Sequence, residues 1–190
     1  MRIFGLNSAK IPEPLIAEYC GFLTRLQEQF PQRAFLHQKF TQGKTYVTVL
    51  AKYGITAVLK HFPGLGRVPA DTHHFSARLD ASIDILLATD WMPFREISRN
   101  TKAGIMLGHV TLTSIDPDHP TSGSLATVRF LREKWGITGL LVTDDFSMAP
   151  LSHGPGGIAR AAENSMVAGV DLILLSYDAA AVYDLLGAEL

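Results

Sequence analysis

The chain has 190 residues, of which 47% are hydrophobic and 18% are charged, and its formal net charge is −1. This composition is typical of a globular domain and excludes a disordered chain. Because the net charge is close to zero, we expect no nucleic-acid partner and no binding to an anionic membrane. The length suits one domain spanning residues 1–190.

The cysteine content and the beginning of the chain bear on the cellular compartment. Cys20 is the single cysteine and cannot form an internal disulfide, so nothing indicates a secreted, disulfide-rich protein. No apolar run approaches the ~20 residues that a membrane-spanning helix needs. The segment Met1–Asn7 lacks the apolar core of a signal peptide. We therefore expect a cytoplasmic protein.

Short runs of branched and apolar residues alternate along the chain with longer helical patterns. The expected helices span residues 12–29, 41–52, 80–100, 124–135 and 158–168. The expected strands span residues 55–60, 104–107, 140–143 and 170–175. Three glycines lie between an expected helix and the strand that follows it: Gly54, Gly136 and Gly169. Helices often end in a residue with a left-handed backbone conformation, which favours glycine. This alternation predicts an α/β fold with a parallel sheet, and segment 30–43 looks like an insertion.

Polar residues gather at the ends of the expected strands or directly after them. In strand order they are Lys60 and His61, then His109, then Asp144 and Asp145, then Ser176 to Asp178. In a (β/α)₈ barrel, or TIM barrel, the carboxyl ends of the strands form the active face. A closed barrel needs about 250 residues. The pattern therefore predicts an incomplete TIM barrel with about four or five βα units.

The densest polar segment, residues 60–74, is a strand end followed by a loop rich in proline and glycine. The loop carries Asp71 two residues before His73. A carboxylate beside an imidazole can orient the ring and raise its basicity, which predicts a general acid/base unit. Zinc is a poor interpretation, because His61, His73 and His74 lack the spacing of zinc ligands on one element.

A second polar segment ends a hydrophobic run in two adjacent carboxylates, Asp144 and Asp145. Successive side chains of an extended backbone point to opposite sides, so the two cannot share one role. One carboxylate can enter a pocket while the other braces the loop. The alternative is that both only cap a following helix.

Several segments, in this order and spacing, resemble the β-N-acetylglucosaminidase branch of family 3 glycoside hydrolases. They are Lys-His-Phe-Pro-Gly-Leu-Gly (60–66), Asp-Thr-His (71–73), Ile-Met-x-x-His-Val (105–110), Thr-Asp-Asp-x-x-Met (143–148) and Ala-Gly-Val-Asp-Leu (168–172). The resemblance covers about the last two-thirds of the chain. Single pieces are weak, whereas the combination is highly specific.

The resemblance implies a role for each matched residue. Asp144 would be the nucleophile, and His73 would be the acid/base, held by Asp71. Lys60 and His61 would bind sugar hydroxyls. The reaction would be a double displacement with net retention, and it would require no metal and no organic cofactor.

Three further residues are expected to bind substrate. Arg2 begins Arg-Ile-Phe-Gly, which matches a short family motif that places an arginine against the sugar. His109 and Met148 belong to matched segments, but a structural histidine and a packing methionine are the alternatives. Family members commonly carry histidine where this chain has Leu65, which bears on hydrogen bonding in the loop.

The family's first strands, and a substrate-binding aspartate on them, have no counterpart here, so we expect a C-terminal fragment, a mis-started reading frame or a truncated product. The implied activity is removal of terminal β-linked N-acetylglucosamine from glycans such as peptidoglycan fragments. A small carbohydrate is thus the expected partner. Alternatives are a non-catalytic sugar-binding remnant and a phosphorolytic enzyme, whereas β-glucosidase activity is disfavoured by the His-Asp unit.

Overall fold

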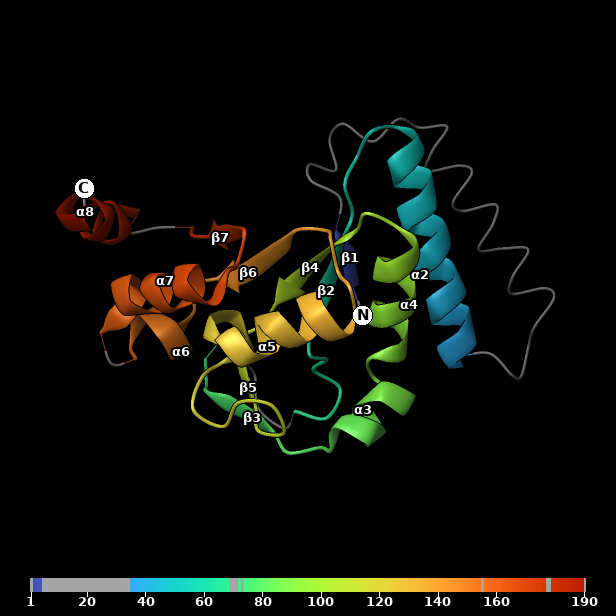
Figure 1. Cartoon of the computed structure of the whole chain (residues 1–190), viewed down its shortest axis with the longest axis horizontal. Coiled ribbons are helices and arrows are strands. Elements are labelled where there is room, and N and C mark those ends of the chain that lie inside the picture. Colours follow the sequence, from blue (N-terminus) through green and yellow to red (C-terminus); the bar gives the residue numbers. More distant parts are fainter. Residues whose placement is uncertain are drawn as a thin grey trace.

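A five-stranded sheet is the centre of the molecule (Figure 1). The structure, a computed structural model, describes residues 2–4, 35–68, 72, 74–154, 156–176 and 179–189. In their order across the sheet, the strands are β1 (Arg2–Phe4), β2 (Val58–Phe62), β4 (Gly104–Leu107), β6 (Leu141–Asp145) and β7 (Leu172–Leu174). Strands β2, β4, β6 and β7 are parallel, and β1 pairs antiparallel with β2.

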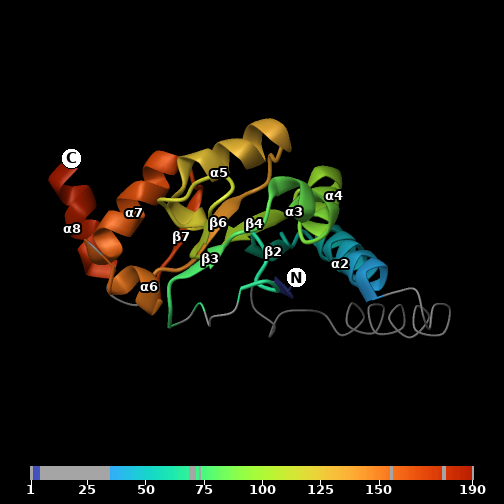
Figure 2. The ribbon, with the colours of Figure 1, turned by 90° about the horizontal axis from the view of Figure 1, so that it is seen from below.

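Helices precede, connect and follow the parallel strands, as expected of consecutive βα units. They are α2 (Phe35–Lys52), α3 (Ile83–Ala88), α4 (Met92–Asn100), α5 (Leu125–Arg129), α6 (Ala149–Ser152), α7 (Gly157–Ala168) and α8 (Ala179–Glu189). A 3-10 turn, η2 (Thr121–Gly123), precedes α5, and a π-helical turn, η3 (Phe130–Lys134), extends it. Figure 2 shows α4, α5 and α7 on the same side of the sheet. The predicted α/β fold is thus confirmed.

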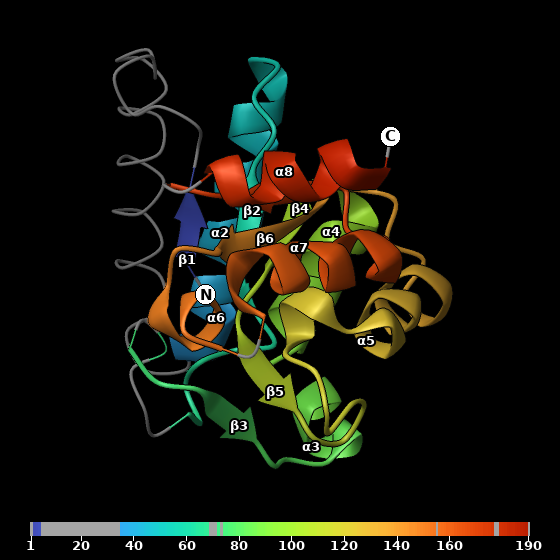
Figure 3. The same ribbon diagram turned by 90° about the vertical axis from the view of Figure 1, so that its left-hand side faces the viewer.

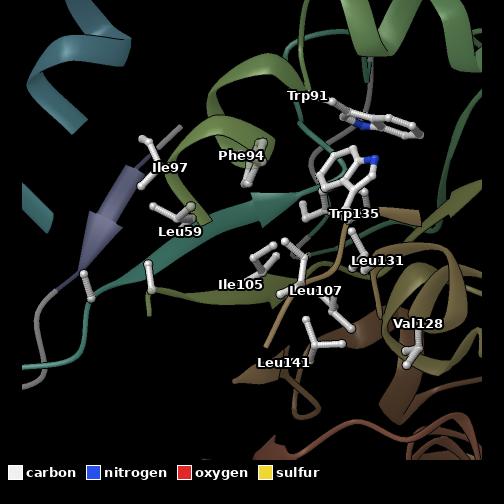
Figure 4. Close-up of a cluster of buried hydrophobic side chains, with 14 of the residues drawn as sticks. Leu59, Trp91, Phe94, Ile97, Ile105, Leu107, Val128, Leu131, Trp135 and Leu141 are labelled. Atoms are coloured by element: carbon white, nitrogen blue, oxygen red, sulfur yellow. The ribbon is translucent and has the colours of Figure 1, made fainter. Parts of the chain in front are cut away.

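The core lies between the parallel strands and these helices. Leu59, Ile105 and Leu141, one from each of three neighbouring strands, are fully buried. Over them lie Trp91 and Trp135, whose ring centroids are 5.5 Å apart (Figure 4). Burial of such large side chains supplies most of the driving force for folding. The core thus fixes the relative positions of β2, β4 and β6.

The predicted strands are confirmed, with shifted ends. Strand 104–107 has the predicted bounds. The strand predicted at 55–60 begins at Val58 and continues to Phe62, so Lys60 and His61 lie inside it. The strand predicted at 140–143 continues through Asp144 to Asp145. These four polar residues therefore belong to the strands rather than to the loops beyond, whereas His109 and Ser176 follow the ends of β4 and β7.

Two helix predictions need correction. The single helix predicted at 80–100 is two helices, because the backbone leaves the helical path at Thr89 and the amide of Trp91 returns to the carbonyl of Leu86 at 2.8 Å. Pro93 then starts α4, where its missing N–H costs no hydrogen bond. The helix predicted at 41–52 begins earlier, at Phe35, so residues 35–43 of the segment interpreted as an insertion form its first half. The helix predicted at 12–29 lies outside the described residues.

A small second sheet was not predicted. Strands β3 (Ala77–Leu79) and β5 (Val110–Leu112) pair in parallel, apart from the main sheet (Figure 3). Three residues are too few to show a clear period. This sheet ties the chain after β2 to the chain after β4, on the carboxyl side of the main sheet. No helix among the described residues is long and apolar enough to cross a membrane.

The amino ends of β6 and β7 are joined by one carboxylate. Asp171 accepts a hydrogen bond from the amide of Leu141 at 2.7 Å and from Arg132 at 2.5 Å. Arg132 also donates to the carbonyl of Gly139 at 2.7 Å. These contacts give the Ala-Gly-Val-Asp segment a structural role at the end of the sheet opposite to the polar residues.

Candidate active site

His61 and Asp144 meet at the carboxyl edge of the sheet, although β4 lies between their strands. The register places Phe62, Leu107 and Thr143 in one row across β2, β4 and β6. His61 precedes this row and Asp144 follows it. His61 Nε2 lies 3.4 Å from Asp144 Oδ2, and the two side chains are 16% and 15% exposed. The pair is thus mostly enclosed but reachable from solvent.

The neighbourhood of this pair is shaped by packing on β2 and β4. Phe62 is fully buried, and its ring lies 5.4 Å from that of Trp91 and 5.7 Å from that of Trp135. A β-carbon at Gly108 would lie 3.4 Å from the carbonyl oxygen of Phe62 and 3.7 Å from Cβ of His61. The backbone at Gly108 therefore packs closely against Phe62 and His61.

The two adjacent carboxylates have different partners, as the extended backbone predicts. Asp144 Oδ1 accepts from the amide of Asp145 at 3.0 Å. The carboxylate of Asp145 accepts from the amides of Ser147 at 2.9 Å and Ser176 at 3.1 Å, and from the hydroxyl of Ser176. Burial alone would raise the pKa of Asp145, but the hydrogen bonds from Ser176 and Ser147 outweigh it and lower the pKa. Asp145 is therefore an ionised brace between β6 and the chain after β7.

His109, which follows β4, is buried behind the carboxylates. Its Nε2 lies 2.9 Å from the carbonyl oxygen of Asp145, and its Nδ1 lies 2.9 Å from the hydroxyl of Ser122. Burial lowers the pKa of His109, although the Asp145 carbonyl and the charges of Asp144 and Asp145 oppose this effect. The ring is therefore neutral at physiological pH. Sequence reasoning missed Ser122, because nothing local to η2 marks it.

The loop that carries the expected acid/base unit is anchored where it leaves β2. The indole N–H of Trp91 donates to the carbonyl of Pro63 at 2.9 Å. Arg67 donates to Asp90 at 2.7 Å, which ties the loop to the turn between α3 and α4. Asp71 and His73 themselves lie outside the described residues.

Comparison with known proteins identifies the family of this chain. The chain matches the family described as "Glycosyl hydrolase family 3 N terminal domain" over residues 30–189. The chain belongs to glycoside hydrolase family 3. The resemblance expected from the motifs at 60–66 and 143–148 is therefore confirmed.

Named relatives of this family 3 chain are β-hexosaminidases. One from Xanthomonas campestris pv. campestris is 34% identical over 134 residues, which cover 70% of this chain and 40% of the relative. One from Neisseria gonorrhoeae is 36% identical over 126 residues, which cover 66% of this chain and 35% of the relative. The chain thus spans less than half the length of these relatives.

Solved structures confirm the incomplete TIM barrel. A family 3 β-N-acetylglucosaminidase from Paenibacillus sp. str. FPU-7 superposes with a TM-score of 0.75 at 29% identity, over 80% of this chain and 30% of that one. The β-N-acetylglucosaminidase from Thermotoga maritima gives a TM-score of 0.70 at 27% identity, over 78% of this chain and 33% of that one. The parallel strands β2, β4, β6 and β7 are consecutive strands of that barrel.

The structure also places the other residues predicted to bind sugar in this family 3 chain. Lys60 is half-buried in β2, next to His61, and the backbone of Arg2 in β1 lies level with it. Met148 is half-buried just before α6, and its amide donates to the carbonyl of Asp145 at 3.1 Å. Lys60, His61, Asp144 and Met148 are thus brought to one end of the sheet.

A pocket of about 430 Å³ opens beside His109. The loops that follow β4 and β6 enclose it, together with Ser76 and α7. Its charged and polar lining includes His119, Arg160 and Asn164. Asp144 and His61 are not among its described lining residues, so the pocket lies beside this pair without containing it.

Proposed function

We propose that this chain carries the nucleophile and part of the sugar-binding site of a retaining β-N-acetylhexosaminidase. The observation that carries the proposal is the contact of His61 with Asp144 at the carboxyl edge of a family 3 barrel. In TIM barrels this edge is where catalytic residues come together from different strands. The relatives named β-hexosaminidase and β-N-acetylglucosaminidase support terminal β-linked N-acetylglucosamine as the substrate.

The hydrogen bonds support Asp144, rather than Asp145, as the reactive carboxylate. Its Oδ1 is oriented by the amide of Asp145, and its Oδ2 faces His61. Asp145 is occupied by Ser147 and Ser176 and is therefore unavailable to a sugar. A carboxylate that is held in one orientation and partly open to solvent is suited to attack a bound anomeric carbon.

The proposed reaction is a double displacement. A carboxylate oxygen of Asp144 forms a bond to the anomeric carbon while the bond from that carbon to the leaving oxygen breaks, and His73 gives its proton to the leaving oxygen. Water then attacks the anomeric carbon, His73 takes a proton from the water, and the ester bond to Asp144 breaks. Asp71 would orient His73, while Lys60, His61 and Arg2 would hold the sugar hydroxyls.

The proposed substrates are glycans that end in β-linked N-acetylglucosamine, such as fragments from cell-wall turnover. A β-glycosidic bond places the leaving oxygen on the face opposite to the nucleophile, where His73 would protonate it. Phosphate could attack the same ester in place of water, so hydrolysis and phosphorolysis share the first step. The measured product distinguishes them.

The deciding experiment is hydrolysis of an aryl N-acetyl-β-glucosaminide by the 190-residue chain and its Asp144→Asn variant. We expect the substitution to lower kcat by roughly 10³-fold or more, because the nucleophile is lost. Asp184→Asn, on the outlying helix α8, is the matched control and should retain the wild-type rate.

Covalent trapping identifies the nucleophile directly. A fluorinated N-acetylglucosaminyl fluoride should leave a sugar ester on Asp144, located by peptide mapping. An adduct on any other carboxylate would contradict the assignment. Wild-type protein that binds N-acetylglucosamine but neither turns over nor traps the sugar would instead support a sugar-binding remnant.

A further inference from the structure

The carbonyl oxygen of Asp145, the residue after the proposed nucleophile, has two hydrogen-bond partners. It accepts from the amide of Met148 at 3.1 Å and lies 2.9 Å from Nε2 of His109. A carbonyl oxygen only accepts hydrogen bonds, and its two lone pairs are matched here by these two donors. The imidazole must therefore carry its proton on Nε2.

The other ring nitrogen completes a buried chain of hydrogen bonds. With the proton on Nε2 of the neutral ring, Nδ1 accepts from the hydroxyl of Ser122 at 2.9 Å. The carbonyl of Ser122 in turn accepts from the hydroxyl of Ser165 on α7 at 2.7 Å. His109, Ser122 and Ser165 are 3%, 1% and 0% exposed. The chain thus connects α7, through η2 and the end of β4, to the end of β6.

We propose that His109 is a positioning residue for Asp144, acting through the carbonyl of Asp145 rather than by contact with the sugar. This inference rests on the proposed function of Asp144. Both ring nitrogens already bond to protein atoms, so the substrate-binding role expected from the motif is replaced by a supporting one.

The geometry explains why this support matters. Residue 145 is held on one side by Ser176, after β7, and on the other by His109, after β4. Its amide is the group that orients Asp144 Oδ1. A shift of this residue therefore moves the nucleophile, and misplacement by about 1 Å can cost ~10²-fold in rate.

Two substitutions, His109→Gln and His109→Asn, distinguish the positioning role from a role of His109 in packing alone. In His109→Gln the side-chain amide can reach the position of Nε2 and donate to the Asp145 carbonyl. In His109→Asn the amide reaches only the position of Nδ1 and meets Ser122 instead. We expect kcat on an aryl N-acetyl-β-glucosaminide to fall by roughly 10- to 100-fold in the Asn variant, with KM unchanged, and to be largely restored in the Gln variant.

Nuclear magnetic resonance on the labelled full chain provides a readout that does not depend on turnover. Ring nitrogen shifts should show a neutral imidazole protonated at Nε2. The ¹³C resonances of the Asp145 carbonyl and the Asp144 carboxyl should move in the Asn variant and return toward wild type in the Gln variant. Unfolding in urea identifies any variant that has lost its fold.

The possible outcomes are distinct. Equal kcat in the Gln and Asn variants, or an Nδ1-protonated ring, would overturn the positioning role. Turnover that does not require Asp144 would overturn the proposed function instead. In that case the ¹³C resonances of residues 144 and 145 alone test whether His109 holds the end of β6. If His109→Asn left these resonances unmoved, the positioning role of His109 would be overturned.

Discussion

The carboxylate of Asp145 has more hydrogen-bond partners than that of Asp144, the proposed nucleophile. Two amides and a hydroxyl donate to its carboxylate, and they hold its pKa below the ordinary value of 3.8 although burial raises it. A carboxyl whose pKa is lower in the folded state stabilises the fold when it is ionised. Asp145 therefore contributes to stability above about pH 3.8, and the contribution is lost as the pH falls through its folded value.

We predict that Asp145→Asn lowers the free energy of unfolding at pH 7 by about 1 kcal/mol, because a partly exposed carboxylate loses charge-assisted hydrogen bonds. Urea unfolding at pH 7, 5 and 3 should show this difference shrinking in acid. Asp184→Asn is the control and should follow the wild-type curve. A difference that stays constant with pH would contradict the ionised brace.

The identity of the site residues could be predicted more readily than their partners. Lys60, His61 and Asp144 follow from polar residues at strand ends, and the register of parallel strands brings them together. His109 bonds to a serine 13 residues away and a carbonyl 36 residues away. Such contacts arise only when η2 and β6 are packed, so no local pattern encodes them. The chemical roles of all the site residues, with Asp71 and His73 among them, stay predictions.

The strands were predictable because each is a short apolar run between glycines or polar residues. Helix α7 was predicted almost to its bounds, and Gly169 ends it with a φ of 87°. The break between α3 and α4 was missed although Pro93 signals it, because apolar residues continue on both sides. Strands β3 and β5 were missed because three residues are too few to show the alternation of apolar and polar residues that marks a strand.

Where β4 and β6 begin, their backbones approach so closely that a side chain is excluded. A β-carbon on Gly139 would lie 2.3 Å from the carbonyl oxygen of Ala103, which is backbone and cannot move aside alone. We predict that Gly139→Ala lowers the free energy of unfolding by about 1–3 kcal/mol or more.

The matched substitution Gly66→Ala adds a methyl group where no neighbour lies within 4 Å. Its expected effect is within about 0.5 kcal/mol. Both are measured by urea denaturation at neutral pH. Equal effects would show that the β4–β6 approach is looser than the structure indicates.

The two ends of the main sheet carry different kinds of polar residues: structural contacts lie at one end and the candidate site lies at the other. Asp171 and Arg132 join the amino ends of the strands, whereas His61, Asp144 and Asp145 occupy the carboxyl ends. The alternation of helices and strands, the polar residues at the strand ends and the chain length together predicted this partial TIM barrel. They could not predict the antiparallel β1 at the edge of β2, because strand direction there depends on how the chain returns to the sheet.

The other edge of the sheet, β7, has consequences for the behaviour of the protein in solution. Among the described strands, β7 pairs only with β6, and its Leu172 and Leu174 are 53% and 41% exposed. An open edge with apolar side chains is a template for pairing with another strand. Tyr183 on α8 and Val167 on α7 add apolar surface near it, since α8 packs on α7.

We therefore predict that the chain self-associates through β7 at micromolar concentration and above, which sedimentation velocity would detect as a rise in mean mass with concentration. Leu172→Lys should suppress this association, because a lysine on an edge strand opposes pairing with a second copy. Ile85→Lys, at a similarly exposed position on α3, is the control and should leave association unchanged. If both lysine variants reduced association equally, charge alone would explain the effect. A wild-type chain that stayed monomeric at all concentrations would show that something other than a second copy protects the β7 edge.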